Sequence, residues 1–154
     1  PLIVALGSLM GVLSNSGYSN RWFTALDLPP SVPPGWVFGA AWTTLYTLMA
    51  VAFAMILNAR GAAGRGVAVA AFLIQLIANY AWSPLFFGAR EITLGLYLIL
   101  FILAAAIVTT FLFARVRRLA AWLMVPYLVW LSFASILAYQ IDQRNPDGES
   151  LVPP

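Results

Sequence analysis

Long uninterrupted apolar runs constrain the fold of this chain more than any other feature. Four of them are each about 22 residues long, enough for an α-helix to cross roughly 30 Å of hydrocarbon at about 1.5 Å per residue. They cover residues 36–58, 66–87, 92–114 and 119–141, and a shorter run covers residues 1–14. Apolar residues do not alternate with polar ones, so membrane strands are not expected. The sequence therefore predicts an all-α membrane protein, a single-domain five-transmembrane-helix bundle.

Composition also indicates a lipid environment. The 154 residues are 62% hydrophobic and 8% charged, with a mean hydropathy of +0.90, whereas a soluble domain carries about 25% charged residues. The chain has no cysteine and no histidine, which removes disulfides, thiolate chemistry and the commonest metal ligand. Its eight basic residues are all arginines, and arginines in short loops do not make a nucleic-acid surface.

The links between the apolar runs are short, with one exception. Residues 15–35 are long, proline-rich and aromatic, and long loops inside compact domains are usually functional. We interpret this loop 1 as a lid over one mouth of the bundle, and an ordinary surface loop is the alternative. Residues 142–154 form a polar tail that we expect to be loose.

Charges are distributed unevenly between the two sides of the predicted bundle. All five acidic residues lie on the side of loop 1 and the tail, together with three arginines. The positive-inside rule then places loops 2 and 4 in the cytoplasm, and loop 1 and the C-terminus on the opposite side. We expect a multi-pass integral membrane protein from a bacterium. The five arginines of loops 2 and 4 are Arg60, Arg65, Arg115, Arg117 and Arg118.

The predicted spans contain no clear intramembrane charge. Ion-coupled transporters generally need a buried acid or base, and acid–base catalysis needs paired carboxylates or a serine–histidine arrangement. Aromatic, amide and hydroxyl side chains remain. These groups suit the binding of a large apolar ligand with a few polar atoms.

Three predicted helices carry such side chains at the spacing of one helix face. An amide in hydrocarbon costs on the order of several kcal/mol unless it is hydrogen-bonded, so the amides must face the interior. If these helices share an interior, the stripes line one pocket. Alternatively, the amides join helices and the tryptophans form an interface belt, and the two roles are compatible. The stripes are Phe38, Trp42 and Tyr46; Gln75, Asn79 and Trp82; and Tyr127, Trp130, Ala134 and Leu137.

Small residues recur at four-residue spacing, in Gly7 and Gly11, in Gly35 and Gly39, and in Gly66 and Ala70. This spacing lets helices approach closely within a chain or in a dimer. It also argues against a cleaved signal peptide at residues 1–14, where no basic start is visible. Pro84 and Pro126 each lack a backbone donor and are expected to bend or start a helix.

Three motifs in register resemble the translocator protein family, also called the peripheral benzodiazepine receptor and, in bacteria, the tryptophan-rich sensory protein. They are "PPGWVFGAAWTTLYTLMA", "NYAWSPLFFGAR" and "VPYLVWLSFASIL". The resemblance runs from about Trp22 to Asn145. It implies five tightly packed helices, usually a homodimer, with a ligand pocket closed by loop 1. Family ligands are porphyrins such as protoporphyrin IX and haem, cholesterol, and synthetic benzodiazepine-site drugs.

Several positions match residues that the family uses, and a few depart from its pattern. Trp22 matches the loop 1 tryptophan with which some bacterial members photodegrade porphyrin. Ala138 and Tyr139 stand where such members have Asn and often Trp, which puts a two-tryptophan mechanism in doubt. Pro30 and Ser31 stand where an aromatic is usual. The matched ligand-binding positions are Trp42 and Tyr46, Asn79 and Trp82, and Trp130, Ala134 and Leu137.

Leu137, Tyr139 and Arg144 also satisfy a proposed sterol pattern. Because Leu137 and Tyr139 are about 200° apart on a helix, both cannot face one pocket. We interpret Tyr139 as an interface anchor and Arg144 as a snorkelling side chain.

We expect a membrane receptor or translocator that requires no cofactor and binds a porphyrin, haem or a similar flat apolar ligand such as a sterol. Without histidine, haem iron would lack its usual axial ligand, so the ring is what the protein would recognise. The alternatives are a photo-oxidative porphyrin-degrading enzyme that uses Trp22, and a regulatory membrane scaffold. Expected partners are the lipid bilayer and a second copy of the chain.

Overall fold

In a computed structural model of the chain, residues 3, 5, 23, 26, 35–89 and 91–145 are described. They are helical apart from short links, and no strand occurs within these ranges. The elements are α3 (Gly35–Asn58), α4 (Arg65–Ser83), the π-helical turn η2 (Pro84–Gly88), α5 (Ile92–Val116) and α6 (Arg118–Arg144). The all-α class is therefore confirmed. The predicted span 1–14 and most of loop 1 lie outside the described residues, so the fifth transmembrane helix stays a prediction.

Within the described ranges, four helices are long and apolar enough to cross a membrane. Compared with the predicted runs, α3 begins one residue earlier and α5 ends two residues later. Helix α6 starts one residue earlier and ends three later, so the first part of the predicted polar tail, residues 142–144, is helical. The loop between α5 and α6 is thereby reduced to a single residue, Arg117.

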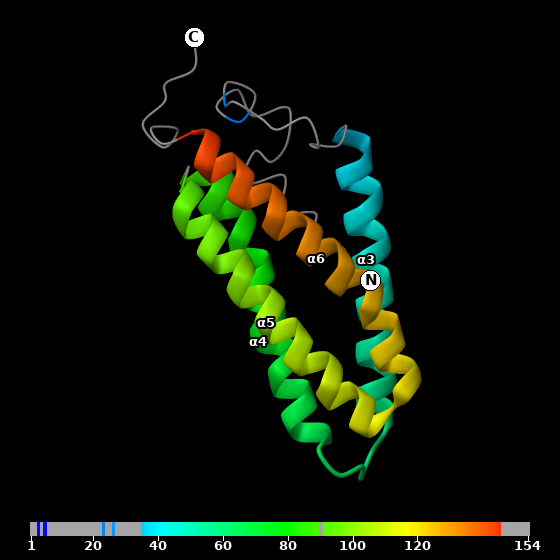
Figure 1. Cartoon of the computed structure of the whole chain (residues 1–154). Helices are drawn as coiled ribbons and strands as arrows, with labels where there is room; N and C mark the ends of the chain where they lie inside the picture. The colour runs from blue at the N-terminus through cyan, green and yellow to red at the C-terminus, as the bar shows by residue number, and fades with distance from the viewer. Residues whose placement is uncertain are drawn as a thin grey trace.

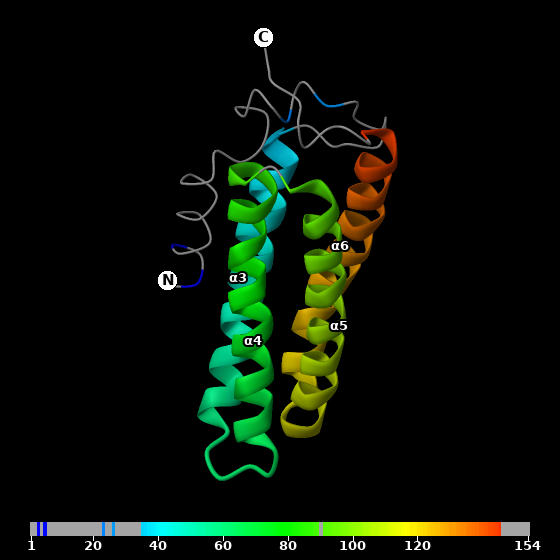
Figure 2. The same cartoon turned by 90° about the vertical axis from the view of Figure 1, so that its left-hand side faces the viewer.

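The helices form an antiparallel bundle in which α6 packs against α5 and α3, and α4 packs against α5. Figure 1 and Figure 2 show the α3–α4 turn and the α5–α6 junction at one end of the bundle. The start of α3 and the end of α6 lie at the other. Short links force this arrangement, because consecutive helices must then lie side by side. In the α3–α4 turn, Gly61 and Gly64 have φ values of 79° and 82°, a left-handed conformation that favours glycine.

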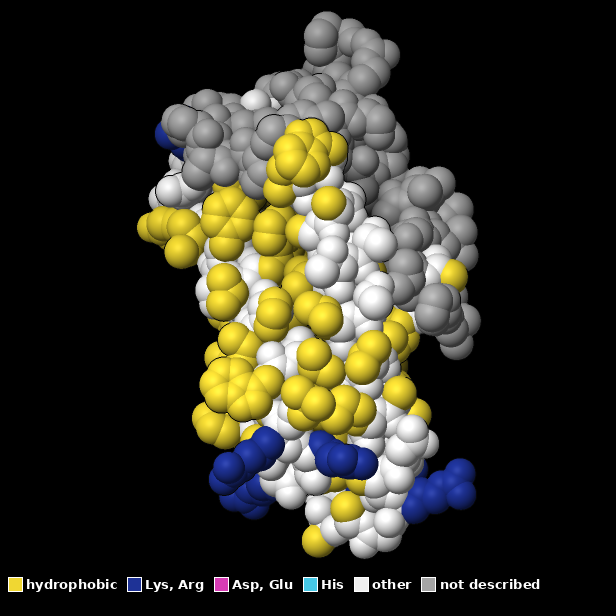
Figure 3. All heavy atoms as spheres, turned by 90° about the vertical axis from the view of Figure 1, so that its right-hand side faces the viewer, with side chains coloured by type: hydrophobic (Ala, Val, Ile, Leu, Met, Phe, Trp, Pro, Cys, Tyr) yellow, Lys and Arg dark blue, Asp and Glu magenta, His cyan; other side chains and the backbone are white. Residues whose placement is uncertain are grey.

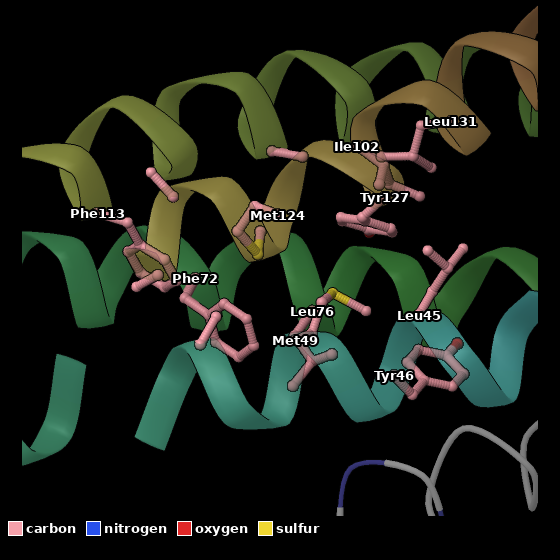
Figure 4. Packing of buried hydrophobic residues seen from close by; sticks show 14 of the residues in the cluster. Leu45, Tyr46, Met49, Phe72, Leu76, Ile102, Phe113, Met124, Tyr127 and Leu131 are labelled. Carbon is pink, nitrogen blue, oxygen red and sulfur yellow. The ribbon is translucent and has the colours of Figure 1, made fainter. Parts of the chain in front are cut away.

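The central cluster of buried apolar residues fills the space between the four helices (Figure 4). Met49 of α3 and Met124 of α6 are fully buried and point into it. Nearer the α3–α4 turn, Phe72 stacks between Phe53 and Phe113, with ring centroids 4.3 and 5.8 Å away. Such packed rings hold α3, α4 and α5 together without directional polar contacts.

The end cluster lies at the loop 1 end of the bundle. It joins two residues of loop 1 to η2 and to the neighbouring ends of α5 and α6. Pro84 begins η2, where its missing N–H ends the α-helical pattern, and Ala89 N–H then donates to the Pro84 carbonyl at 2.8 Å. Helix α6, by contrast, continues through Pro126. The members of the end cluster are Phe23, Leu26, Phe86, Phe87, Ile92, Leu137 and Ile141.

The outer faces of the helices are apolar as well. Large side chains such as Phe111, Trp122 and Val129 are more than three-fifths exposed, and apolar side chains cover much of the face in Figure 3. Water would not tolerate so much continuous apolar surface, whereas lipid does. A lipid bilayer is therefore the environment that this surface fits.

Candidate functional site

A chain of side-chain hydrogen bonds crosses the interior of the bundle and joins α3, α4 and α6. The Tyr46 hydroxyl donates to Asn79 Oδ1 at 2.6 Å, and Asn79 Nδ2 donates to the Tyr127 hydroxyl at 2.8 Å. Tyr127 in turn donates to Gln75 Oε1 at 2.7 Å. Gln75 Nε2 ends the chain 4.0 Å from the weakly accepting sulfur of Met49. We call Tyr46, Gln75, Asn79 and Tyr127 the polar network.

All four members of the polar network are buried. Gln75 and Tyr127 are 0% exposed, Asn79 6% and Tyr46 8%. Away from water, an amide or hydroxyl without a partner costs about 1–3 kcal/mol, so each member depends on the next. The prediction that Gln75 and Asn79 face the interior is confirmed, as is the shared interior of α3, α4 and α6. The amides do join helices.

The direction of the hydrogen bonds decides which donors and acceptors of the polar network remain unused. Asn79 uses its oxygen and one of its two N–H groups, so a second N–H remains. The Tyr46 hydroxyl uses its hydrogen, so its oxygen can still accept. One donor of Asn79 and one acceptor of Tyr46 are thus not used within the network.

Two tryptophans lie against the Tyr46 end of the network. Trp42, one turn before Tyr46 on α3, stacks on the Tyr46 ring with centroids 5.4 Å apart. Its indole meets Trp130 of α6 edge to face at 6.1 Å, and both tryptophans are half-buried. We call Trp42 and Trp130 the tryptophan pair. Ala134, one turn beyond Trp130, packs against the same central cluster.

Trp82 and Leu137, two further predicted site residues, have other neighbours, although Trp82 also packs against the central cluster. Trp82 Nε1 donates to the Gly95 carbonyl of α5 at 3.1 Å, and its ring stacks on Phe86 at 5.0 Å. Gly95 makes this possible, because a Cβ there would lie 3.0 Å from Phe86 Cδ2 and 3.7 Å from Trp82 Nε1. Leu137 is buried in the end cluster. The predicted site residues therefore lie in three places: in the polar network and the adjoining tryptophan pair, beside the central cluster, and in or against the end cluster.

Comparison with known proteins identifies the family. The TspO/MBR family model matches residues 1–144. This chain belongs to the TspO/MBR family. The family recognised from the sequence motifs is thereby confirmed.

Mammalian and bacterial relatives of this TspO/MBR chain share about a third of its residues. The translocator protein of Bos taurus is 36% identical over 146 residues, which cover 94% of this chain and 86% of the bovine protein. The tryptophan-rich protein TspO of Chlorobaculum tepidum is 40% identical over 126 residues, 81% of this chain and 80% of the relative. The tryptophan-rich sensory protein of Cereibacter sphaeroides is 32% identical over 126 residues, 82% of this chain and 78% of the relative.

Loop 1 of this TspO/MBR family member meets the bundle in the end cluster. Phe23 and Leu26 are 4% and 6% exposed, and the Phe23 ring lies 5.2 Å from Phe87 and 6.2 Å from Phe86. Trp22, Pro30 and Ser31 lie outside the described residues. The lid role of loop 1 and the photochemical role of Trp22 stay predictions.

The three residues of the sterol pattern do not share a face. Leu137 is buried in the end cluster, whereas Tyr139 is 55% exposed and Arg144 is exposed in the last turn of α6. Ala138, which replaces the family's Asn, is buried. The outward positions of Tyr139 and Arg144 suit contacts with the membrane interface.

Tyr127 and Gln75 belong to the polar network; both were members of the predicted stripes but not of the ligand-binding positions matched to the family. The signal was present, because Gln75 lies one turn from Asn79 and Tyr127 lies on the same stripe as Trp130. Tyr80 was missed altogether. Its ring packs 5.8 Å from Tyr46, and its hydroxyl donates to the Ile3 carbonyl at 2.7 Å, which joins Ile3 to α4. Among the described residues, no group of three acidic side chains could hold a metal ion.

Proposed function

We propose that this TspO/MBR family member binds porphyrins, or similar flat apolar ligands such as sterols, between its helices beneath loop 1. The observation that supports this most directly is the tryptophan pair lying on a polar network inside an otherwise apolar bundle. Binding sites for flat ligands combine aromatic walls with a few well-placed polar groups. The relatives' names, translocator protein and tryptophan-rich sensory protein, agree with a transporting or sensing role.

The geometry suggests how such a ligand would be held. A flat ring offers two faces for stacking, and indoles prefer offset or edge contacts like those already made within the tryptophan pair. The second N–H of Asn79 and the hydroxyl oxygen of Tyr46 would meet a polar atom at the ring edge. Because the chain has no histidine or cysteine, recognition would rest on the ring and not on axial ligation of haem iron.

Titration of the purified protein with metal-free protoporphyrin IX tests this proposal. We expect tryptophan quenching with a dissociation constant on the order of 1 μM. The double variant Trp42→Ala/Trp130→Ala should weaken binding at least about tenfold, a loss of about 1.4 kcal/mol. Trp122→Ala is the matched control, since this indole is 68% exposed on the outer face of α6. Unchanged affinity in the double variant would overturn the proposed site.

We also propose that two copies of the chain associate through the outer face of α4. Gly66 and Ala70 are exposed one turn apart, and no atom lies within 4 Å of where a Gly66 Cβ would be. Ile74 and Ile77 continue this face at 55% and 68% exposure. Small residues let two helices approach closely in lipid. A Gly66→Leu/Ala70→Leu variant should shift the protein to monomers in light scattering, and a persistent dimer would exclude this face.

A further inference from the structure

We propose that the α5–α6 turn binds the phosphate headgroup of an anionic phospholipid through Arg115, Arg117 and Arg118. This site lies at the opposite end of the bundle from loop 1 and does not depend on the ligand proposed above. Three observations support it: the distance of both described acidic side chains from the turn, the position of the arginines at the turn, and the exposed aromatic residues one helical turn away.

The end of the bundle that carries this turn is strongly positive. Arg115, Arg117 and Arg118 are exposed, and the two acidic residues that the structure describes lie at the far end. Glu91 immediately precedes α5, and Asp142, in the last turn of α6, accepts a hydrogen bond from Thr93 at 2.7 Å. Figure 3 shows basic side chains around this end of the molecule, directly beneath an apolar surface. No described carboxylate is therefore available to neutralise the three guanidinium groups.

Not every arginine at this end is equally available. Arg65 is half-buried, and its Nε and Nη2 donate to the Leu57 carbonyl at 3.2 and 2.8 Å, which caps the end of α3. No capping hydrogen bond of this kind is seen for Arg115, Arg117 or Arg118 among the described residues. Their donors remain open to an external anion, and a guanidinium can bind a phosphate through two parallel hydrogen bonds.

The backbone at the turn adds to the positive potential. Arg117 is the single linking residue, in an extended conformation with φ −149° and ψ 115°, and Arg118 begins α6. The first turn of α6 has no acidic residue and no side-chain cap. The first N–H groups of a helix have no intrahelical acceptor, and here no side chain of the first turn supplies one. The N-terminal end of the helix dipole also favours an anion.

Exposed apolar side chains next to the arginines indicate a lipid as the source of the phosphate. Phe111 lies four residues before Arg115 on α5, and Trp122 lies four residues after Arg118 on α6, so each shares a helix face with its arginine. Phe111 is 70% exposed and Trp122 is 68% exposed. Four residues span about 6 Å along a helix, which places each ring deeper in the membrane than its arginine. A phosphate at the arginines would thus be joined to acyl chains lying along these rings.

The charge of the turn selects among phospholipids. Phosphatidylcholine and phosphatidylethanolamine carry an ammonium group beside their phosphate, and three guanidinium groups without a carboxylate repel it. Phosphatidylglycerol has no such cation. The site therefore favours phosphatidylglycerol and other phospholipids with a net negative charge.

Trp122 is a built-in probe for this lipid. The protein is placed in nanodiscs containing phosphatidylglycerol or phosphatidylcholine with brominated acyl chains, and the difference in quenching between wild type and Trp122→Phe isolates this indole from the other five tryptophans. Half-maximal quenching should require severalfold less phosphatidylglycerol than phosphatidylcholine. Each arginine should raise the apparent affinity for phosphatidylglycerol by up to about fivefold. Equal quenching by the two lipids in wild type would overturn the proposal.

The variant Arg115→Gln/Arg117→Gln/Arg118→Gln should abolish the preference for phosphatidylglycerol. Arg60→Gln is the matched control, because it removes an exposed arginine at the same end but outside the turn, and should change the preference less than about twofold. A preference retained in the triple variant would exclude this site. Should that variant misfold, the wild-type preference should still fall from 50 to 500 mM salt, and a salt-independent preference would contradict the proposal. Full competition by inorganic phosphate would reveal a simple anion site and overturn the assignment to a lipid.

Discussion

The polar network joins α3, α4 and α6, whereas the end cluster joins loop 1, η2, α5 and α6, and the two regions are held together by different forces. Asn79 and Trp82 are three residues apart on α4, yet Asn79 bonds to α3 and α6 while Trp82 turns to α5. In the polar network each side chain forms a hydrogen bond with another member, so its stability depends on hydrogen-bond geometry and on the identity of each partner. The end cluster combines three phenylalanine rings that meet edge to face with four aliphatic side chains, so shape matters more than hydrogen bonding there.

This difference indicates which region of the bundle can confer specificity for a ligand. A directional network can present a defined donor and acceptor to a ligand, whereas the packed side chains of the end cluster mainly exclude solvent and hold Phe23 against η2. Substitutions should therefore act differently in the two regions, through lost partners in one and through steric overlap in the other.

The largest effect is expected from Asn79→Leu. This change removes two hydrogen bonds at once and leaves the buried hydroxyl of Tyr46 without its acceptor. The free energy of unfolding should fall by about 2–3 kcal/mol, measured by denaturation with sodium dodecyl sulfate in mixed micelles. Asn58→Leu, at the exposed end of α3, is the control and should change stability by less than about 0.5 kcal/mol. Similar losses in both variants would mean that the network contributes no special stability.

A smaller loss is expected from Gly95→Ala in the wall of the end cluster. The added methyl group would lie 3.0 Å from Phe86 Cδ2, so the Phe86 ring, on which Trp82 stacks, must give way slightly. We expect a loss of about 1–2 kcal/mol and an altered near-UV circular dichroism of the indole. Gly39→Ala provides the comparison, because no atom lies within 4 Å of its Cβ position. There the helix propensity of alanine should stabilise α3 by up to about 1 kcal/mol.

The smallest effect is expected from a double-mutant cycle that tests whether the polar network acts as a unit. Tyr46→Phe and Tyr127→Phe each remove a hydroxyl bonded to Asn79. Each should cost about 0.6–1.7 kcal/mol, with a coupling energy of at least about 0.5 kcal/mol between them. The same cycle between Tyr46→Phe and Phe23→Leu, which belongs to the end cluster, should show additivity. Additive losses in both cycles would mean that the hydrogen bonds act independently.

Much of the architecture followed from local chemistry. The apolar runs predicted four of the observed helices to within a few residues at each end, because hydrocarbon requires long helices whose backbone groups bond internally. The inward orientation of Gln75 and Asn79 followed from the cost of an unpaired amide in hydrocarbon. The concentration of arginines at one end followed from counting charges, since short links leave them no other position.

Other features depended on how the helices rotate against one another. Periodicity shows that Asn79 and Trp82 share a face, but the neighbouring helix that each side chain meets is set by tertiary packing. Gly95 is an example, since it leaves room beside α5 for the Trp82 indole, which donates to the Gly95 carbonyl.

The sequence alone determined that this is a helical membrane protein of the TspO/MBR family with inward amides and one arginine-rich end. Only the tertiary structure decided that Tyr127 bridges the two amides, that Asn79 joins α3 to α6, and that Leu137 lies with Phe23 in the end cluster. The physical reason is the distance along the sequence over which each property is determined. Burial and helix length depend on each segment and its solvent, whereas a hydrogen bond across 33 to 52 residues of sequence depends on how separate helices come together.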